Sequence, residues 1–455
     1  MASHGPNDRL RSLLGEADWS AGELARAVNG LGTAQSMTLR YDRTSVAHWL
    51  SGSKPRPAVA ELVAAAFSRR IGRLVTVGET GLAPEVPAVG ARFVDGIREA
   101  PLLQRLVDLA RSDADPTERA HLVQSAYRLV PVPTQDWEQT SALQPAPFDE
   151  KRRATAEDAQ MLNVMTKAFA DQMDRHGGGH ARATLAAYLA NDVTRILIAA
   201  APPLLHRELV TATSQLTHLL ARMTSDAGHQ GLAQIYFETA LELARVAENR
   251  AAYAVTLRAM SAQAMQLGHH RNALALADAA LEAAGPRVNG ATRAFLLSQQ
   301  AVTCAHDGQR RAAITSLSAA EAQLERASST PGPFTSYPRA GLEYQRAQTL
   351  LALGLRADAL AALRDSARLR TPDRRRASAL TEFRVAEVLL AMGNLEEACT
   401  HLNQFLDQWP LLRSAQIDQA VAKLRGSLRP YLRQRQALAV WERARSLADD
   451  LPRRY

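Results

Sequence analysis

Cationic and hydroxyl side chains gather in one short stretch of this sequence, RTSVAHWLSGSKPRP at residues 43–57, and just before it. The members of this group are Arg40, Arg43, Thr44, Ser45, His48, Lys54 and Arg56. Guanidinium and ammonium groups contact phosphates, whereas hydroxyl and imidazole groups can also hydrogen-bond to base edges. Against the single Asp42, the four cations give residues 40–57 a net charge of +3, and the rest of the first 82 residues is neutral. A positive field on one short element favours contact with a polyanion.

The elements that must position these groups are short helices. Val46, Trp49 and Leu50 follow i, i+3, i+4 spacing, which predicts a helix from Thr44 or Ser45 to Gly52 with these three residues buried. Its outer face or N-terminal end then carries Arg43, Thr44, Ser45, Ala47 and His48.

The flanking segments also have helix signals. Ser20 and Glu23 form a capping-box pattern that opens a helix with Leu24 and Ala25 facing a core. Downstream, a second helix is expected from Pro57 to Gly72.

The combination of a Leu-Ala helix, S-V-x-x-W-x-x-G and a cation-Pro loop resembles the lambda-repressor-like helix-turn-helix domain. The resemblance implies a recognition helix that meets base edges in the major groove of double-stranded DNA. The group named above would be the DNA-binding residues: Arg43, Thr44, Ser45 and His48 would read bases, while Lys54 and Arg56 hold phosphates.

One departure from that family lies between Gly30 and Trp49, where the segment LGTAQSMTLRYD adds about ten residues to the usual turn. We expect an extended loop over 31–42. Its alternation places Met37, Leu39 and Tyr41 on the domain, with Thr38 and Arg40 directed outward near the DNA backbone.

The longer part of the chain contains an internal repeat marked by five glycines. They are Gly228, Gly268, Gly308, Gly354 and Gly393. The residue five positions after each glycine is alanine, and the residue seven positions before each glycine is Ala or Ser. Twelve positions after the five glycines, in chain order, stand Ala, Ala, Ala, Ser and Phe. Glycine allows the chain to reverse after a helix, and small residues allow two helix axes to approach closely. The pattern predicts stacked helix pairs that share a core.

This pattern resembles tetratricopeptide repeats over residues 205–410, which implies an all-α fold: a small helix-turn-helix domain followed by an α-solenoid. We expect a DNA-binding domain at 1–82, a linker with a helical segment and a Pro-rich loop at 83–150, and the repeat domain at 151–455. The amphipathic stretch LRQRQALAVWERARSL is expected to be a C-terminal capping helix.

Signals for catalysis are weak. The stretch HGGGH at 176–180 could suggest an oxyanion loop or a metal site, but the sequence has neither a G-x-S-x-G elbow nor HExxH, so a turn between helices is expected. His269 and His270 are expected to be exposed in a turn, and TPDRRRAS at 371–378 to be a solvated loop that could help to bind an acidic partner. We therefore expect no enzyme activity, no cofactor and no metal site.

Composition bounds the remaining possibilities. The chain has 455 residues, a net charge of +8 and a pI near 9.8, and only two cysteines, Cys304 and Cys399. Two cysteines are too few for a disulfide framework, and the sequence shows neither an export signal nor an apolar span long enough to cross a membrane. We therefore expect a cytoplasmic protein without membrane contact.

Two functions remain open. The segments LSGSKPRP and GGGHARA resemble those of actinobacterial transcriptional regulators. The resemblance implies a homodimer that binds DNA, with repeats that sense a peptide, a small ligand or a protein. The alternative is a tetratricopeptide-like scaffold or adaptor without sequence-specific DNA binding.

Overall fold

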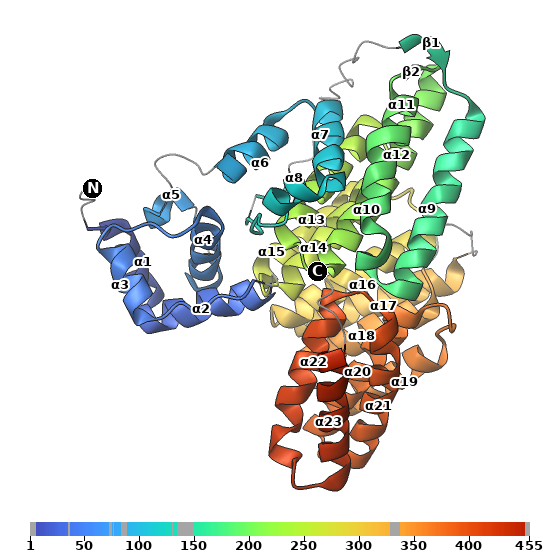
Figure 1. The fold of residues 1–455 in the computed structure, drawn as a ribbon. Coiled ribbons are helices and arrows are strands. Elements are labelled where there is room, and N and C mark those ends of the chain that lie inside the picture. Colours follow the sequence, from blue (N-terminus) through green and yellow to red (C-terminus); the bar gives the residue numbers. More distant parts are fainter. Residues whose placement is uncertain are drawn as a thin grey trace.

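The computed structural model describes residues 6–34, 37–71, 75, 77–82, 89–129, 131–133, 149–327 and 337–450 (Figure 1). Within the expected linker region at 83–150, residues 83–88, 130 and 134–148 lie outside the described residues, so most of its expected Pro-rich loop is not described. Among the described helices, none combines the length and the apolar character that a membrane crossing requires.

The N-terminal part, which we call the head, is a group of short helices around its own core. Its elements are α1 Asp8–Ala17, α2 Ala21–Ala34, α3 Arg43–Leu50, α4 Pro57–Ile71 and α5 Val77–Thr80. The core extends from Leu10 to Leu82 and includes the fully buried Leu62 and Phe67. The head therefore has the apolar centre that a separately packed unit needs.

The next helices pack into the core of the longer part, which we call the body. They are α6 Val89–Glu99, α7 Leu102–Ala114, α8 Pro116–Leu122, α9 Ala156–His176, α10 Gly178–Tyr188 and α11 Thr194–Leu197. One cluster of buried residues joins α6 and α7 to α9 through α16. A short parallel pairing of β1 Asp149–Arg153 with β2 Ala199–Ala200 accompanies them. The helices of 89–129 thus share the core of the body, while the boundaries at 82 and 150 remain predictions.

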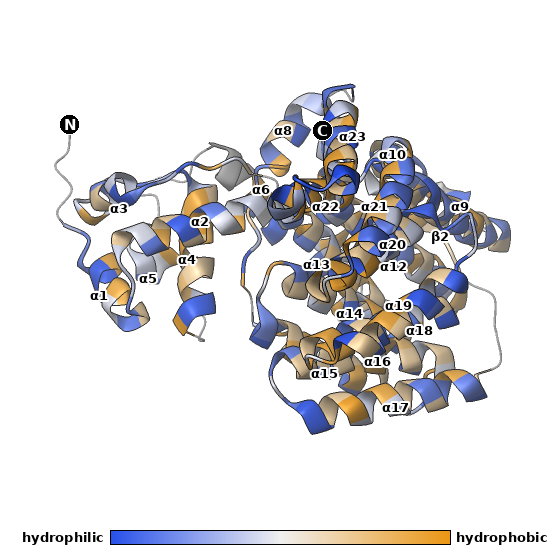
Figure 2. Ribbon diagram, turned by 90° about the horizontal axis from the view of Figure 1, so that it is seen from below, coloured by the Kyte–Doolittle hydropathy of each residue, from blue (hydrophilic) through white to orange (hydrophobic). Residues whose placement is uncertain are grey.

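Five antiparallel helix pairs form the rest of the body, an all-α solenoid of tetratricopeptide-like units (Figure 1). The pairs are α12 Pro203–Asp226 with α13 Gln230–Val246, α14 Arg250–Gln266 with α15 His270–Ala284, α16 Gly290–His306 with α17 Arg310–Arg326, α18 Arg339–Ala352 with α19 Arg356–Arg368, and α20 Arg375–Ala391 with α21 Leu395–Gln408. The first helices of successive pairs contact one another from α12 to α18. Apolar residues lie mainly where helices face each other (Figure 2).

The five repeat glycines occupy the turn inside each pair, as the sequence predicts. Their φ angles are 96°, 79°, 81°, 78° and 85°, a left-handed conformation that side chains with a Cβ disfavour. The alanines five residues later and the small residues seven before are all 0% exposed. Small side chains at these positions let the paired helices pack closely, so the predicted physical reason for the repeat is confirmed.

The chain ends with two helices that cover the last pair. They are α22 Ala415–Leu428 and α23 Arg435–Asp450, preceded by the short 3-10 turns η2 Trp409–Leu411 and η3 Arg429–Tyr431. Helix α23 packs on α21 and α22 through Ala437, Val440 and Ala444, all nearly inaccessible to water. This matches the capping helix expected from the amphipathic sequence.

Candidate nucleic-acid interface

Local hydrogen bonds fix the start of α3. The Asp42 carboxylate accepts from the Ser45 backbone N–H at 2.8 Å and from the Ser45 hydroxyl at 2.7 Å, which completes a capping box. These bonds hold the pKa of the Asp42 carboxyl below its usual value. The helix consequently begins at Arg43, one residue before the earliest expected start, and the Ser45 hydroxyl is engaged in the cap.

The burial pattern of α3 separates an inner face from an outer one. Val46 is 0% exposed and Trp49 is 4% exposed, as predicted, whereas Leu50 is only partly buried. The Trp49 ring meets the Tyr41 ring edge-on, with 5.1 Å between centroids. Packing on this side directs the opposite side of the helix toward solvent.

The outer side of α3 carries four exposed residues: Arg43, Thr44, Ala47 and His48. Helices α3 and α1 lie on the side of the head that faces away from the body (Figures 1 and 2). The site residues predicted from the sequence stay a prediction, since these observations show exposure and not contact.

The connection between α2 and α3 differs in part from the expected loop. Helix α2 continues to Ala34, so the first part of the segment 31–42 is helical. A Cβ on Gly32 would lie 2.4 Å from the Leu39 side chain, which packs there. The Asn29 amide accepts from the Tyr41 N–H at 2.9 Å and donates to the Tyr41 carbonyl at 2.8 Å. These contacts fix the end of the connection directly before α3.

Buried and exposed residues alternate in the connection between α2 and α3, as expected. Met37, Leu39 and Tyr41 are half-buried against the head, whereas Thr38 and Arg40 are exposed. Arg40 therefore lies on solvent beside the N-terminus of α3, on the same short segment as the other predicted contacts.

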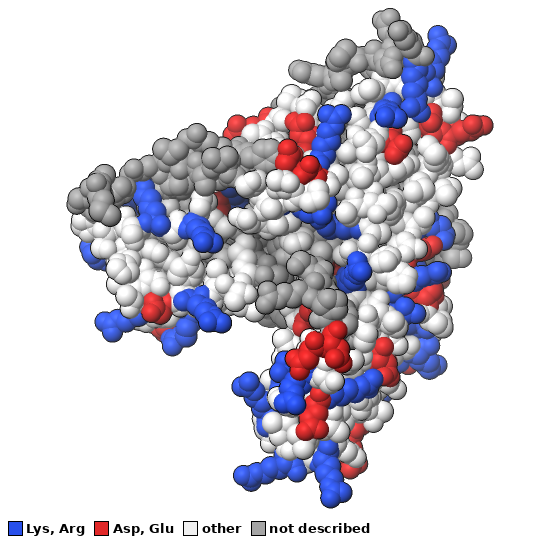
Figure 3. Space-filling model, in the orientation of Figure 1, with Lys and Arg blue, Asp and Glu red and all other residues white. Residues whose placement is uncertain are grey.

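Three arginines around α3 are available to an external anion. Arg40, Arg43 and Arg56 are exposed and make no ion pair with any described residue, and Lys54 is exposed as well. In Figure 3 the charged side chains visible on the head are mostly Lys and Arg, with a smaller group of Asp and Glu, whereas the two signs are mixed over the body. Unpaired surface cations attract a polyanion without first having to break an internal pair.

The head contacts the body through charged groups that sequence reasoning did not single out. Glu61 of α4 pairs with Arg128 at 2.9 Å, and Arg128 also pairs with Asp95 at 3.1 Å. Arg69 of α4 lies against Gly268, where a Cβ would come within 2.6 Å of the guanidinium. These partners are far apart in sequence, so only the fold brings them together.

The HGGGH stretch forms a turn, as expected, and joins the two ends of the body. Gly177 has φ 83° between α9 and α10, and a Cβ there would lie 2.4 Å from the Arg413 carbonyl oxygen. Arg413 N–H donates to the His176 carbonyl at 2.7 Å, and Gly179 N–H donates to the Arg413 carbonyl at 2.9 Å. Close backbone approach explains the glycines.

Two expectations about polar residues in the body are wrong. His269 is 4% exposed and stacks on Tyr127 with 5.5 Å between centroids, because the turn after Gly268 lies under the segment that follows α8. The segment 371–378 is not simply a solvated loop, since Arg374 pairs with Asp174 and Arg376 with Asp226.

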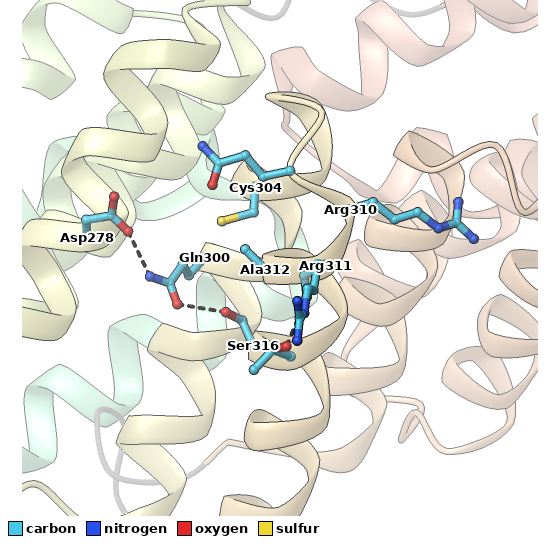
Figure 4. Close-up of a pocket in the computed structure, with 9 residues that line it drawn as sticks. Asp278, Gln300, Cys304, Arg310, Arg311, Ala312 and Ser316 are labelled. Atoms are coloured by element: carbon cyan, nitrogen blue, oxygen red, sulfur yellow. Dashed lines mark hydrogen bonds between the residues drawn. The ribbon is translucent and has the colours of Figure 1, made fainter.

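A hollow of about 710 Å³ lies between α15, α16 and α17 (Figure 4). Gln300 donates to Asp278 and accepts from the Ser316 hydroxyl, both at 2.8 Å, so these polar groups already satisfy one another. Burial and nearby carboxylates raise the pKa of the Cys304 thiol to about 11, which keeps it protonated at neutral pH. The hollow therefore offers no activated nucleophile.

Comparisons with known proteins give a family match for the head and a structural match for most of the chain. Residues 10–83 match the family model described as the SP15 N-terminal domain, whose description states no activity. A search of curated proteins finds no match. Among solved structures, the chain is similar to a chain in the crystal structure of the APC/C hetero-tetramer Cut9-Hcn1, with 15% identity, a TM-score of 0.35 and coverage of 95% of this chain and 68% of that chain. The description of the body as a helical repeat rests on the helix pairs above.

Proposed function

We propose that this helical-repeat protein is a DNA-binding transcriptional regulator whose head contacts duplex DNA through α3. The observation that carries the proposal is the outer face of that helix, where Arg43, Thr44 and His48 are exposed above a buried Val46–Trp49 face. Lys54 and Arg56 follow in the next loop, where they would contact phosphates.

The supporting argument is electrostatic and geometric. An exposed helix flanked by Arg40, Arg43 and Arg56, which make no ion pair with a described residue, can approach the major groove, which admits an α-helix. The cap at Asp42 uses the Ser45 hydroxyl, so base reading falls mainly to Arg43, Thr44 and His48, with Ser45 supporting their position.

A dimer belongs to the same proposal. One helix reads only a few base pairs, and two-fold symmetry would place two copies of α3 about 34–36 Å apart, or a multiple of that distance. The body is the expected source of pairing. Light scattering on the full chain tests this point: a monomer at micromolar concentration would remove the symmetric-site part of the proposal.

Binding to duplex DNA at several salt concentrations tests the main proposal. Fluorescence anisotropy with a duplex selected from a random library should give an affinity that falls steeply as salt increases, because cation–phosphate contacts release counterions. Arg43→Ala should weaken binding to the selected duplex by about 1–3 kcal/mol. Arg368→Ala, an exposed change of equal charge in the body, serves as the control. A flat salt response, or equal effects of the two variants, would reject the assignment.

A scaffold or adaptor without sequence-specific DNA binding is the second candidate. The helical-repeat body favours it, because stacked helix pairs present extended surfaces for protein partners and form the larger part of the described chain. The same anisotropy experiment separates the two candidates, since a scaffold predicts no steep salt dependence.

A further inference from the structure

Helix α9 exposes a row of side chains that is apolar in its middle and charged at its two ends. We call this row the α9 stripe; its members, all exposed, are Glu157, Met161, Val164, Ala168 and Arg175. Met161 is 43% exposed and Val164 is 60% exposed. The other side of the helix contacts α10, α12 and α20. The stripe is therefore the face of α9 that the described helices leave without a partner.

Helical periodicity places these side chains on one line. Glu157 and Arg175 are 18 residues apart, which is about five turns, so they point the same way from positions about 27 Å apart along the axis. At about 100° per residue, Met161, Val164 and Ala168 all lie within about 40° of that line. The apolar residues thus stand between the two charged ones on the same face.

The start of α12 adds to this apolar surface. Leu204, in the first turn of α12, is 76% exposed. Strand β1 precedes α9 and strand β2 precedes α12, and the two strands pair, so the two helices begin side by side. Met161, Val164 and Leu204 therefore gather at one edge of the body. Exposed apolar residues that gather in one place mark interaction surfaces, whereas single ones are ordinary.

The two charged ends of the stripe have opposite signs and no ion-pair partner. Glu157 and Arg175 make no ion pair with any described residue. The pKa of the exposed Asp373 is lowered mainly by a hydrogen bond from Thr371 and to a smaller extent by Arg175, yet Asp373 and Arg175 form no ion pair. Each end of the stripe can therefore accept a partner of the opposite charge.

This order of charges is complementary to a second copy of the helix that runs in the opposite direction. A two-fold axis level with residue 166 brings Glu157 of each copy opposite Arg175 of the other, because 166 is midway between them. Residue 166 is also midway between Val164 and Ala168, so these two meet across the axis. A crossing angle of about 20° keeps both ends of the helices within reach. In a parallel pair, by contrast, Glu157 would face Glu157 and Arg175 would face Arg175.

We propose that the α9 stripe is the surface through which two copies of this chain form an antiparallel, two-fold symmetric dimer. The apolar middle is removed from water on pairing, and the charged ends set the direction and the register of the two helices. The inference rests on the dimer in the proposed function and identifies its surface. Figures 1 and 2 both show α9 at the margin of the body opposite the head, so this pairing leaves both heads clear of the interface.

Sedimentation equilibrium of the full chain without DNA tests the surface. Val164→Arg should weaken dimerisation by about tenfold or more, because it places a cation from each copy in the apolar middle. Val164 is exposed, so the variant should keep the wild-type circular dichroism. Ile314→Arg is the matched control, since Ile314 is 39% exposed on a helix, α17, outside the proposed interface. It should leave the dimer unchanged.

Charge reversal tests the direction and the register. Glu157→Arg and Arg175→Glu should each weaken the dimer by about tenfold or more, because like charges then face each other at both ends. The double variant should recover a dissociation constant within about threefold of the wild-type value, since opposite charges meet again. Glu396→Arg is the control: Glu396 is also exposed, unpaired and in the first turn of its helix, so the reversal has the same effect on the helix end.

The outcomes separate this inference from the proposed function. A wild-type chain that is monomeric at micromolar concentration would overturn both the α9 interface and the dimer part of the proposed function. A dimer that persists in Val164→Arg, or one that the double charge reversal fails to restore, would overturn the α9 interface alone. Contact of α3 with DNA is tested separately by the anisotropy experiment.

Discussion

The head and the body use arginine in opposite ways. Around α3, Arg40, Arg43 and Arg56 are exposed and have no carboxylate partner among the described residues. In the body many arginines pair across helices, as Arg182 does with the buried Asp113 at 2.6 Å and Arg376 with Asp226 at 2.6 Å. An external anion can reach the first kind directly, whereas the second kind joins elements of the fold.

The two regions also differ in how their helices are positioned. Two helices of the head begin at reciprocal caps, Ser20 with Glu23 and Asp42 with Ser45, and helix α9 of the body begins at a similar cap between Thr155 and Asp158. The body relies on close helix packing at small residues that repeat along the chain. The cap at Asp42 fixes where α3 begins, while stacking makes the body a continuous frame.

Removing Trp49 tests whether the head depends on one large core side chain. Trp49→Ala should lower the unfolding free energy of the head by about 3–5 kcal/mol, because a buried aromatic side chain is replaced by a cavity. Native-state hydrogen exchange of α2 and α4 measures this effect separately from the body. Leu438→Ala, at a 37% exposed position, should change stability by no more than about 0.5 kcal/mol. If the amides of α2 and α4 in Trp49→Ala exchange as slowly as in the wild type, Trp49 does not stabilise the core of the head.

Acid should destabilise the body through the half-buried His229 and the buried His269. Burial lowers the pKa of both His229 and His269 to about 4, with Arg182 the next contributor for His229 and Arg69 for His269. Because the unfolded value is about 6.5, the unfolded chain binds more protons between these two values. Stability is therefore fully present above pH 6.5 and falls as the pH decreases toward 4, by about 2–3 kcal/mol for each histidine at pH 4.5.

Replacing one histidine isolates its contribution to the pH dependence of the unfolding free energy. His269→Phe preserves a ring against Tyr127 and removes the titrating group, so the difference in unfolding free energy between pH 7 and pH 4.5 should shrink. His121→Phe, at an exposed position on α8, is the comparison. Equal slopes in wild type and His269→Phe would exclude the proposed titration.

Two glycines of the body should respond to the same substitution with opposite signs. Gly308→Ala forces a Cβ into the left-handed conformation at φ 81°, which costs about 1–2 kcal/mol although the Cβ meets no neighbour. Gly426→Ala lies inside α22, where a Cβ also meets nothing, so it should stabilise by about 0.5–1 kcal/mol. Chemical denaturation of both variants measures the contrast. A destabilised Gly426→Ala would show that backbone conformation does not decide the sign of the effect.

The smallest expected effect concerns a single phosphate contact by the head. Lys54→Ala should weaken binding to all duplexes alike and reduce the slope of log K against log salt by about one unit. Salt titration of binding to selected and unselected duplexes provides the measurement. A loss confined to the selected duplex would move Lys54 from phosphate contact to base reading.

The sequence alone determined the features that depend on nearby residues. The cap at Ser20, the burial of Val46 and Trp49, and the left-handed turns at the repeat glycines follow from spacing and side-chain size. Backbone conformation and helix periodicity act over a few residues, so their signals are legible without the fold. The small residues at the helix contacts could also be predicted from the sequence, because the same pattern recurs five times.

Tertiary structure decided what depends on residues that are far apart along the chain. Arg376 meets Asp226 across 150 positions, which turns an expected solvated loop into a join between the ends of the body. His269 is buried because Tyr127 covers it, and α2 continues past Gly30 with Leu39 packed at Gly32. Electrostatic and packing energies depend on distance in space, and sequence separation does not encode that distance.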